Sequence, residues 1–264
     1  MGHGVEINKI YNENCLDTMR RMPDGFIDLT VTSPPYDNLR EYKGYSFDFE
    51  PIAQELFRVT KKGGVVVWIV NDATINGSET GTSFKQALYF KEIGFRLHDT
   101  MIWNKRSFTA VGSLNVRYAP VFEFMFVLTN ERPSVANIIR DRRNKKAGVI
   151  INGTIRQKDG TTKKQTGFGV KKIRNIGPRH NVWELVPEKS NINRKHPAQF
   201  PEQLANDHII SWSNEGDLVY DPFSGSGTTA KMAMLNSRNY IGSELAEEYC
   251  QIAEERISKA EAGR

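Results

Sequence analysis

A proline-rich turn, Thr32-Ser33-Pro34-Pro35-Tyr36, carries the side chains of this chain that are best suited to chemistry. Its two prolines restrict the backbone, so the Ser33 hydroxyl and the Pro34 carbonyl are preset hydrogen-bond acceptors, and Tyr36 offers a flat face for stacking. Such acceptors suit an exocyclic amine of cytosine or adenine, because hydrogen bonds from its N–H groups localise a lone pair that the ring delocalises. A rigid turn without chemistry is the alternative.

A glycine turn between a strand and a helix forms a second candidate site. The strand Asp217–Asp221 leads into the sequence Pro-Phe-Ser-Gly-Ser-Gly-Thr-Thr, residues 222–229, and a helix follows. Glycines let the backbone approach a ligand, and the free N–H groups at a helix start attract negative charge. The chain has no Gly-Lys-Ser/Thr here, so a P-loop is excluded.

An acidic residue, Glu244, follows about twenty residues later at the end of the next expected strand. In a Rossmann-like cradle this position holds a ribose through its hydroxyls. The alternatives are a packing turn without a ligand and, for Glu244, a neighbour of a helix N-cap. Together the turn and Glu244 favour a cofactor that contains a nucleoside.

Strands and helices alternate along most of the chain, which is typical of a doubly wound α/β sheet. Val65–Val70 is wholly apolar, as in a parallel strand that is covered on both faces. Both candidate turns follow strands, and such sheets place their ligands at the carboxyl ends of strands. The expected strands are Phe26–Thr32, Val65–Val70, Phe95–Trp103, Val121–Thr129, Asp217–Asp221 and Tyr240–Glu244, and the expected helices are Pro51–Lys62, Thr82–Ile93, Gln199–Trp212, Thr228–Leu235 and Ala246–Ser258.

A strongly basic segment interrupts this alternation. From Arg140 to Arg179 it holds thirteen Lys or Arg against Asp141 and Asp159, whereas the whole chain of 264 residues has a net charge of only +5. A mildly acidic body with one basic insert is typical of a protein that binds a polyanion, and a solvated loop is the alternative. We expect one α/β domain, made of residues 1–130 and 183–264, with a small hairpin or loop module inserted at residues 131–182.

Composition excludes several classes of protein. The longest apolar run, Val65–Val70, is too short to span a membrane, and the first residues lack the apolar core of a signal peptide. Two cysteines, Cys15 and Cys250, are too few for a disulfide scaffold or a zinc ribbon. The five histidines form no ligand cluster, so we expect no metal. These features favour a cytoplasmic protein.

The two turns resemble the two signature motifs of the S-adenosylmethionine-dependent DNA amino-methyltransferases, which make N4-methylcytosine or N6-methyladenine. Flanking segments also resemble this family, namely residues 14–17, 195–201 and 240–244. The order of catalytic motif, basic insert and cofactor motif resembles the circularly permuted β class. The resemblance implies a mostly parallel seven-stranded sheet with one antiparallel strand, in which Phe95–Trp103 and Val121–Thr129 form the hairpin at that edge.

The resemblance implies S-adenosylmethionine as the cofactor. Phe223, Gly225 and Gly227 would line its methionine side, and Glu244 would hold its ribose. Asn14 stands where the family commonly has an aspartate that contacts the adenine amino group, so this contact would be made by an uncharged oxygen. The segment from Lys195 to Phe200 would close over the methionine end. The residues assigned to the cofactor are Asn14, Cys15, Lys195, His196, Ala198, Gln199, Phe200, Asp221, Phe223, Ser224, Gly225, Gly227, Thr228 and Glu244.

The same resemblance makes double-stranded DNA the partner, with a base that is flipped out of the duplex onto Tyr36. Ser33, Pro34, Pro35 and Tyr36 would form the catalytic turn. Ser at the first position leans towards cytosine N4, and Asp or Asn leans towards adenine N6. We therefore expect cytosine N4 and keep adenine N6 as the alternative. The residues assigned to DNA are Arg40, Arg142, Arg143, Lys145, Lys146, Arg156, Lys163, Lys164, Lys171, Lys172 and Arg174.

A second copy of the chain and a cognate restriction endonuclease encoded nearby are further partners that the resemblance suggests, for a prokaryotic or phage-encoded protein. Two other functions stay open: a catalytically silent nucleic-acid-binding protein with the same fold, and methylation of RNA or of a protein glutamine. The intact turns argue against the silent protein. The basic insert favours nucleic acid, and the Ser at position 33 and the permuted order disfavour a protein substrate.

Overall fold

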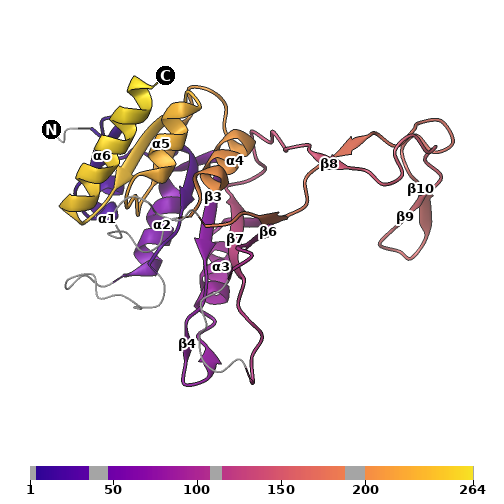
Figure 1. Ribbon diagram of the computed structural model, residues 1–264, viewed down its shortest axis with the longest axis horizontal. Helices are drawn as coiled ribbons and strands as arrows, with labels where there is room; N and C mark the ends of the chain where they lie inside the picture. The colour runs from indigo at the N-terminus through magenta and orange to yellow at the C-terminus, as the bar shows by residue number, and fades with distance from the viewer. Residues whose placement is uncertain (1–3, 36–46, 108–114, 188–199, 264) are drawn as a thin grey trace. The chain divides into compact units, whose positions relative to one another are not determined.

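The computed structural model describes residues 4–35, 47–107, 115–187 and 200–263 (Figure 1). The chain divides into two compact units. The first unit joins Met1–Asn137 to Asn181–Arg264, and the second unit is Ile138–His180. The second unit therefore falls inside the segment that the sequence marks as an insert.

The first unit is built on a mixed sheet whose described residues form eight strands in the order β1-β14-β13-β2-β3-β7-β6-β12. Neighbouring strands are parallel except at β7, which runs antiparallel to both β3 and β6. The expected α/β class with a mostly parallel sheet is thus confirmed. The strands are β1 (Lys9–Tyr11), β2 (Ile27–Thr32), β3 (Thr60–Val70), β6 (Arg96–Asn104), β7 (Phe122–Thr129), β12 (Val182–Glu184), β13 (Leu218–Asp221) and β14 (Asn239–Ser243), and a small hairpin is formed by β4 (Thr74–Ile75) and β5 (Ser78–Glu79).

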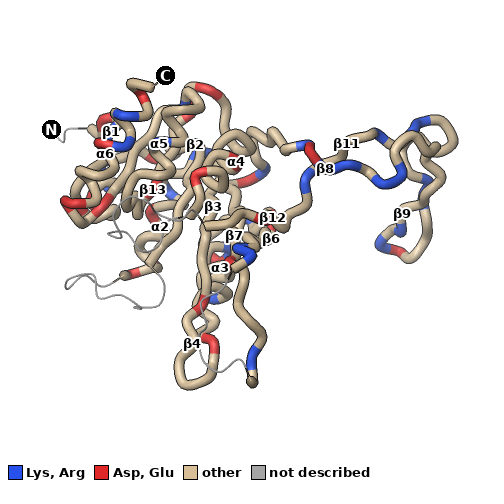
Figure 2. Tube along the Cα trace, in the orientation of Figure 1, with Lys and Arg blue, Asp and Glu red and all other residues tan. Residues whose placement is uncertain are grey.

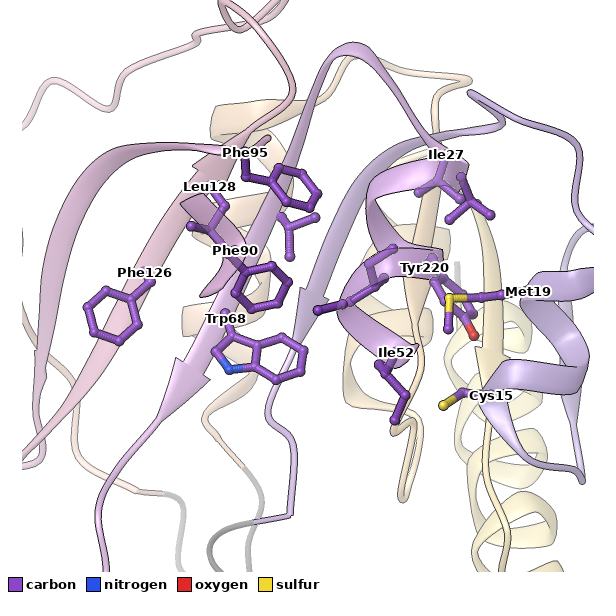
Figure 3. Packing of buried hydrophobic residues seen from close by; sticks show 14 of the residues in the cluster. Cys15, Met19, Ile27, Ile52, Trp68, Phe90, Phe95, Phe126, Leu128 and Tyr220 are labelled. Atoms are coloured by element: carbon purple, nitrogen blue, oxygen red, sulfur yellow. The ribbon is translucent and has the colours of Figure 1, made fainter. Parts of the chain in front are cut away.

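Six helices in the described part of the chain cover the two faces of this sheet. Alternate residues of β3 point to opposite faces, so Val66 and Trp68 belong to one buried cluster and Val65 and Val67 to the other. The first cluster includes side chains of α1, α2 and α3 (Figure 3), and the second includes side chains of α4 and α5. A third cluster joins α5 and α6 to Ile10 of β1. The helices are α1 (Cys15–Arg20), α2 (Phe49–Val59), α3 (Thr82–Glu92), α4 (Glu202–Trp212), α5 (Thr228–Leu235) and α6 (Glu247–Ala262).

The expected count of seven strands is wrong, because the sheet gains β12 at its edge. This strand pairs in parallel with β6, from Val182↔Ile102 to Glu184↔Asn104. Trp183 is only 6% exposed and stacks on His208 with 4.5 Å between ring centroids. Burial of this large side chain explains why so short a strand joins the sheet. The β6–β7 hairpin is therefore next to the edge rather than outermost.

Several expected boundaries are also wrong: helix α6, for example, ends at Ala262 instead of Ser258, and the end of α2 differs as well. Helix α2 ends at Val59 instead of Lys62, because Thr60 already pairs with Ile27 in the sheet. Strand β3 consequently includes Gly63 and Gly64. Gly63 has a φ of +81°, a conformation that other residues rarely adopt. A strand pairing between distant residues has overridden the local helical pattern.

The second unit contains two short antiparallel pairs. Strand β8 (Arg142–Arg143) pairs with β11 (Ile176–Gly177), and β9 (Thr154–Arg156) pairs with β10 (Thr162–Lys164). All six residues of β9 and β10 are exposed. Backbone hydrogen bonds, such as Ile151 N to Lys171 O over 2.8 Å, connect the loops between the two pairs. This unit presents side chains to solvent rather than enclosing a core.

Candidate active site

The two candidate turns lie at the same edge of the sheet, because they follow neighbouring parallel strands. Ser33 and Pro34 directly follow β2, and the glycine turn (residues 222–227) directly follows β13. These strands pair at Val219↔Leu29 and Tyr220↔Thr30. The order of strands in the sheet thus brings together two motifs that lie at opposite ends of the sequence.

A buried hydrogen bond joins the two strand ends. Thr32 Oγ1 donates to Asp221 Oδ1 over 2.6 Å, across 189 positions of sequence. Thr32 is fully buried and Asp221 is 2% exposed. A second tie runs from Thr229 Oγ1 at the start of α5 to the carbonyl of Val31 over 3.0 Å. Both ends of the glycine turn are therefore fixed against β2.

The carboxyl group of Asp221 has an unusual environment. Burial raises the pKa of Asp221 to about 6, although the hydrogen bonds from Thr32 Oγ1 and Phe223 N favour its charged form. Burying a carboxylate without a positive partner costs free energy, so burial disfavours the charged form of Asp221. A positive charge nearby would offset this cost.

The proline turn is only partly described. Ser33 and Pro35 are half-buried and Pro34 is buried, which places the serine at the boundary between core and solvent. Five further positions that the sequence assigns to the site, together with the DNA-binding candidate Arg40, fall outside the described residues. They are Tyr36, Lys195, His196, Ala198 and Gln199. Phe200 is described and is half-buried directly before α4.

The glycine turn depends on two close approaches. Gly227 has a φ of +78°, and a Cβ there would lie 2.7 Å from the Cβ of Ala253 on α6. A Cβ on Gly242 of β14 would lie 2.7 Å from Ser224 Oγ. Helix α6 therefore packs directly against Gly227, where the positive φ and the close approach both require glycine. Strand β14 packs at Gly242 against the side chain of Ser224.

Two polar groups at this turn have capacity for a ligand. Ser224 is 5% exposed, and its hydroxyl oxygen has no hydrogen-bond partner among the described residues. Glu244 accepts from Gly225 N over 2.8 Å and from Ala246 N over 2.9 Å, one bond to each carboxylate oxygen. Burial raises the pKa of Glu244 against the effect of these bonds. Each carboxylate oxygen has a second lone pair, so Glu244 can still accept from a hydroxyl.

Asn14 and Cys15 open helix α1 beside this edge of the sheet. Asn14 caps the helix, since its Oδ1 accepts from Leu16 N over 2.9 Å. Cys15 is buried, and burial raises the pKa of its thiol to about 12, so it is no nucleophile. The second lone pair of Asn14 Oδ1 and the amide nitrogen are the groups left to contact a ligand here. Unlike a carboxylate at the same position, this side chain is uncharged and can also donate.

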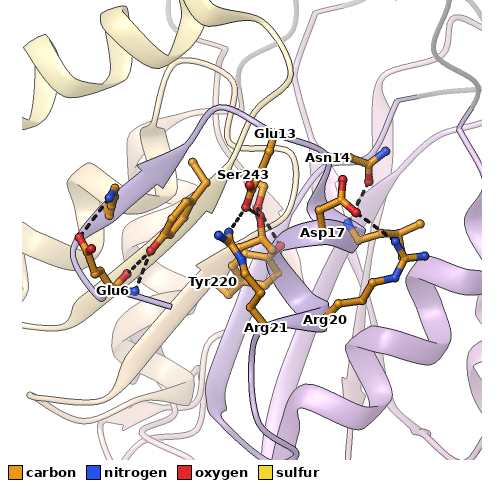
Figure 4. Close-up of polar contacts among 12 residues, drawn as sticks. Glu6, Glu13, Asn14, Asp17, Arg20, Arg21, Tyr220 and Ser243 are labelled. Atoms are coloured by element: carbon orange, nitrogen blue, oxygen red, sulfur yellow. Dashed lines mark hydrogen bonds and ion pairs between the residues drawn. The ribbon is translucent and has the colours of Figure 1, made fainter. Parts of the chain in front are cut away.

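A chain of buried hydroxyls fixes α1 to the sheet (Figure 4). The hydroxyls of Tyr220 and Ser243 lie 3.0 Å apart, Ser243 Oγ donates to Thr18 Oγ1 over 2.9 Å, and Thr18 donates to Glu13 over 2.7 Å. The chain crosses from β13 through β14 to α1. It therefore sets the position of the residues next to Asn14.

Sequence reasoning assigned no role to Thr32 and Thr229, although both lie within the recognised motifs. The hydrogen-bond partner of each is remote in sequence. A buried polar residue at the end of an apolar strand was the available signal, because such a group needs a partner.

The basic candidates of the second unit lie along both strand pairs and the loops between them (Figure 2). Arg142 and Arg143 form β8, Arg156 ends β9, and Lys163 and Lys164 lie on β10. Among the described residues none of these five pairs with a carboxylate. An open hollow within this unit is lined by Arg142, Arg143, Asn144, Lys145, Lys146, Ile173 and His180. Cations around a hollow without carboxylates favour an anion such as phosphate.

The described part of the chain contains neither a cluster of metal ligands nor a membrane-spanning helix. No group of three or more His, Cys, Asp or Glu there is arranged to hold a metal ion. No helix in the same residues has the length and apolar character needed to cross a bilayer.

Comparisons with known proteins agree with this geometry. A family model described as DNA methylase, for the N6 and N4 methylases, matches residues 27–255. The orphan methyltransferase M.BamHII of Bacillus amyloliquefaciens is 54% identical over 241 residues, which cover 89% of each chain. The type II methyltransferase M.BglII of Bacillus subtilis is 27% identical over 271 residues, covering 96% of this chain and 69% of the relative.

Solved structures show the same fold. The cytosine-N4-specific PvuII DNA methyltransferase superposes with a TM-score of 0.69 at 20% identity, covering 98% of this chain and 92% of that one. The complex of M1.HpyAVI with SAM superposes with a TM-score of 0.61 at 21% identity, covering 94% and 98%. At these identities the likeness establishes the Rossmann-like methyltransferase fold.

Proposed function

The chain belongs to the family of N6 and N4 DNA methylases, and from that premise we propose that it methylates the exocyclic amino group of a flipped base in double-stranded DNA. The base that we propose is cytosine, at N4, and the cofactor is S-adenosylmethionine. The observation that carries the proposal is the buried bond from Thr32 to Asp221, which holds the proline turn beside the glycine turn.

The residues around the glycine turn fit this cofactor. When bound, S-adenosylmethionine supplies a methyl group on a positively charged sulfur. Asp221 offers a buried carboxylate, whose charge a cation would stabilise. Ser224 offers a hydroxyl that has no hydrogen-bond partner among the described residues, and Glu244 has lone pairs for ribose hydroxyls. Phe223, Gly225, Gly227 and Thr228 complete this cradle, and Asn14 would bind the adenine through its amide.

The proline turn would orient the base. In the proposed reaction the Ser33 hydroxyl and the Pro34 carbonyl accept hydrogen bonds from the two amino hydrogens, so the nitrogen lone pair is directed outward. Orientation of this kind accelerates transfer strongly, since effective molarities reach about 10⁵ M or more. The nitrogen attacks the methyl group as a neutral amine, the carbon–sulfur bond breaks, and the methylated nitrogen then loses its extra proton to water. Neither Ser33 nor Pro34 has to take up a proton before the attack, so an uncharged serine suffices. Tyr36 would supply the stacking face for the extruded ring.

The choice of cytosine rests on Ser33. In the family, Asp or Asn at this position leans towards adenine N6, whereas the neutral hydroxyl of Ser leans towards cytosine N4. Digestion of methylated duplex DNA to nucleosides, followed by mass spectrometry, tests this choice. We expect N4-methylcytosine. N6-methyladenine would retain the proposed geometry of attack and contradict our use of Ser33 to assign the base.

The second unit would bind the DNA. Those of its cations that pair with no carboxylate among the described residues can contact phosphates, and the exposed β9–β10 ribbon has the two-stranded form that fits the major groove. Lys145 and Lys146 border the hollow and are suited to phosphate contacts. Arg156 ends β9 on the ribbon and is suited to the base edges.

Salt dependence tests this role. In a fluorescence anisotropy titration of duplex binding, changing both Lys145 and Lys146 to Gln should reduce the slope of log affinity against log salt by about two, or about one per lost phosphate contact. The matched control is Lys259→Gln, at an exposed lysine of α6 in the first unit. An unchanged slope for the double variant would remove these two lysines from the interface.

A further inference from the structure

An arginine of the last helix, Arg256, contacts the glycine turn, although no motif includes it. Its Nη1 lies 2.7 Å from the carbonyl oxygen of Ser226, 2.6 Å from Ser226 Oγ and 3.3 Å from Thr228 Oγ1. Its Nη2 donates to Glu202 Oε1 over 2.7 Å. One guanidinium group thus links the turn that precedes α5 to the first residue of α4.

The side chains of Arg256 and its partner Glu202 are largely shielded from solvent. That of Arg256 is 16% exposed, and that of Glu202 is 26% exposed. Lys231 of α5 also donates to Glu202 Oε1, over 2.6 Å. Burial works to raise the pKa of Glu202, but the bonds and charges of Lys231 and Arg256 outweigh it and keep the pKa below its ordinary value. The carboxylate therefore stays charged and holds the guanidinium in place.

The same face of α6 contacts the turn at a second point. Ala253 lies three residues before Arg256, so both side chains project from one side of the helix. Ala253 is the residue that a Cβ on Gly227 would meet at 2.7 Å. Helix α6 thus packs against Gly227 while it bonds to Ser226 and Thr228 on either side.

The link to Glu202 reaches the other segment assigned to the cofactor. Helix α4 begins at Glu202, directly after Phe200 and Pro201. Arg256 is accordingly bonded to the first residue of α4, which follows the segment ending at Phe200, and to the backbone of the glycine turn. Loss of the guanidinium would remove its bonds to both segments at once, although Lys231 would still bind Glu202.

We infer that Arg256 is a positioning residue for cofactor binding, which holds the glycine turn and the start of α4 in the arrangement that receives S-adenosylmethionine. The inference rests on the proposed function. It concerns affinity for the cofactor, because the residue touches the turn and does not reach the proline turn in any described contact.

The test is calorimetric titration of the full chain with S-adenosylmethionine, without DNA. For Arg256→Gln we expect the Kd to rise about tenfold or more, since charge-assisted bonds to the turn are lost. With the cofactor saturating, kcat on duplex DNA should change by less than about threefold, as expected for an effect on binding alone. A wild-type Kd for folded Arg256→Gln would overturn the inference and leave the proposed function standing.

Two further variants make the result decisive. Arg238→Gln is the matched control, because Arg238 also bonds to a carbonyl and a serine, at Ser213, but precedes β14 at the opposite end of the sheet. It should lower thermal stability and leave the Kd within about twofold. Arg256→Lys keeps the positive charge but lacks the two guanidinium nitrogens that bond to the turn and to Glu202, so its Kd should rise at least about threefold. If Arg256→Gln does not fold, a wild-type Kd for Arg256→Lys overturns the inference. If the unaltered chain does not bind S-adenosylmethionine, both the inference and the proposed function are overturned.

Discussion

Replacing Asp221 by asparagine should change how the stability of the protein depends on pH. Burial raises the pKa of this carboxyl to about 6 from an ordinary value of 3.8. Between these two pH values the folded chain keeps a proton that the unfolded chain has released. The unfolding free energy of the natural protein therefore falls as pH rises through this window, and the penalty is complete above the folded pKa.

The size of the effect follows from the shift. About two pKa units correspond to about 3 kcal/mol, of which about 2 kcal/mol develops between about pH 4.5 and about pH 7.5. Asparagine keeps an oxygen that can accept from Thr32 Oγ1 and Phe223 N. It does not ionise, so it avoids the penalty.

The assay is urea unfolding of both proteins at a series of pH values. The unfolding free energy of Asp221→Asn minus that of the natural chain should increase by about 2 kcal/mol from about pH 4.5 to about pH 7.5. Taking this difference cancels all other titrating groups. Asp24→Asn, at an exposed carboxyl, is the control and should give a nearly flat difference. A flat difference for Asp221→Asn as well would refute the assignment of a buried, destabilised carboxylate at this position.

Two other perturbations separate the roles of the site, and a third tests a buried histidine of the core. Ser33→Ala should slow single-turnover methyl transfer by about 100-fold and leave the calorimetric Kd for the cofactor within about twofold, because only the base loses an acceptor; a change confined to the Kd would contradict this role. Glu244→Gln should do the reverse and raise that Kd about tenfold, since a charged acceptor becomes neutral; an unaltered Kd would exclude Glu244 from the ribose site. Burial lowers the pKa of His208 to about 3, so the unfolded chain takes up a proton that the folded chain refuses. The unfolding free energy of the natural chain should therefore fall by about 2 kcal/mol more than that of His208→Phe when the pH is lowered from about 7 to about 5, as measured by urea unfolding. Equal losses in both proteins would contradict this.

Much of the fold could be predicted because its central strands carry a strong pattern. The run Val65–Val70 lies in β3, between β2 and β7, and its side chains alternate between two buried clusters. Strand β12 could not be found in this way, because three residues show no period. Its place in the sheet depends on the burial of Trp183, which is a property of the folded chain.

The candidate site was predictable only in part, and its assigned roles stay predictions. The proline and glycine turns are local patterns of strand, turn and helix, so each could be recognised from its own sequence. The bond between Thr32 and Asp221 depends on β2 lying next to β13, which the order of residues along the chain does not reveal. The contacts of Arg256 depend in the same way on α6 packing against Gly227.

The central claim is that the two turns form one centre for methyl transfer to DNA. The most direct measurement is incubation of the full chain with S-adenosylmethionine labelled in its methyl group, together with mixed-sequence duplex DNA and RNA, followed by separation of the two nucleic acids. We predict that label accumulates in the DNA and that Ser33→Ala reduces its initial rate about 100-fold at equal cofactor occupancy. Label in the RNA alone, or none in DNA while the cofactor binds, would contradict the account.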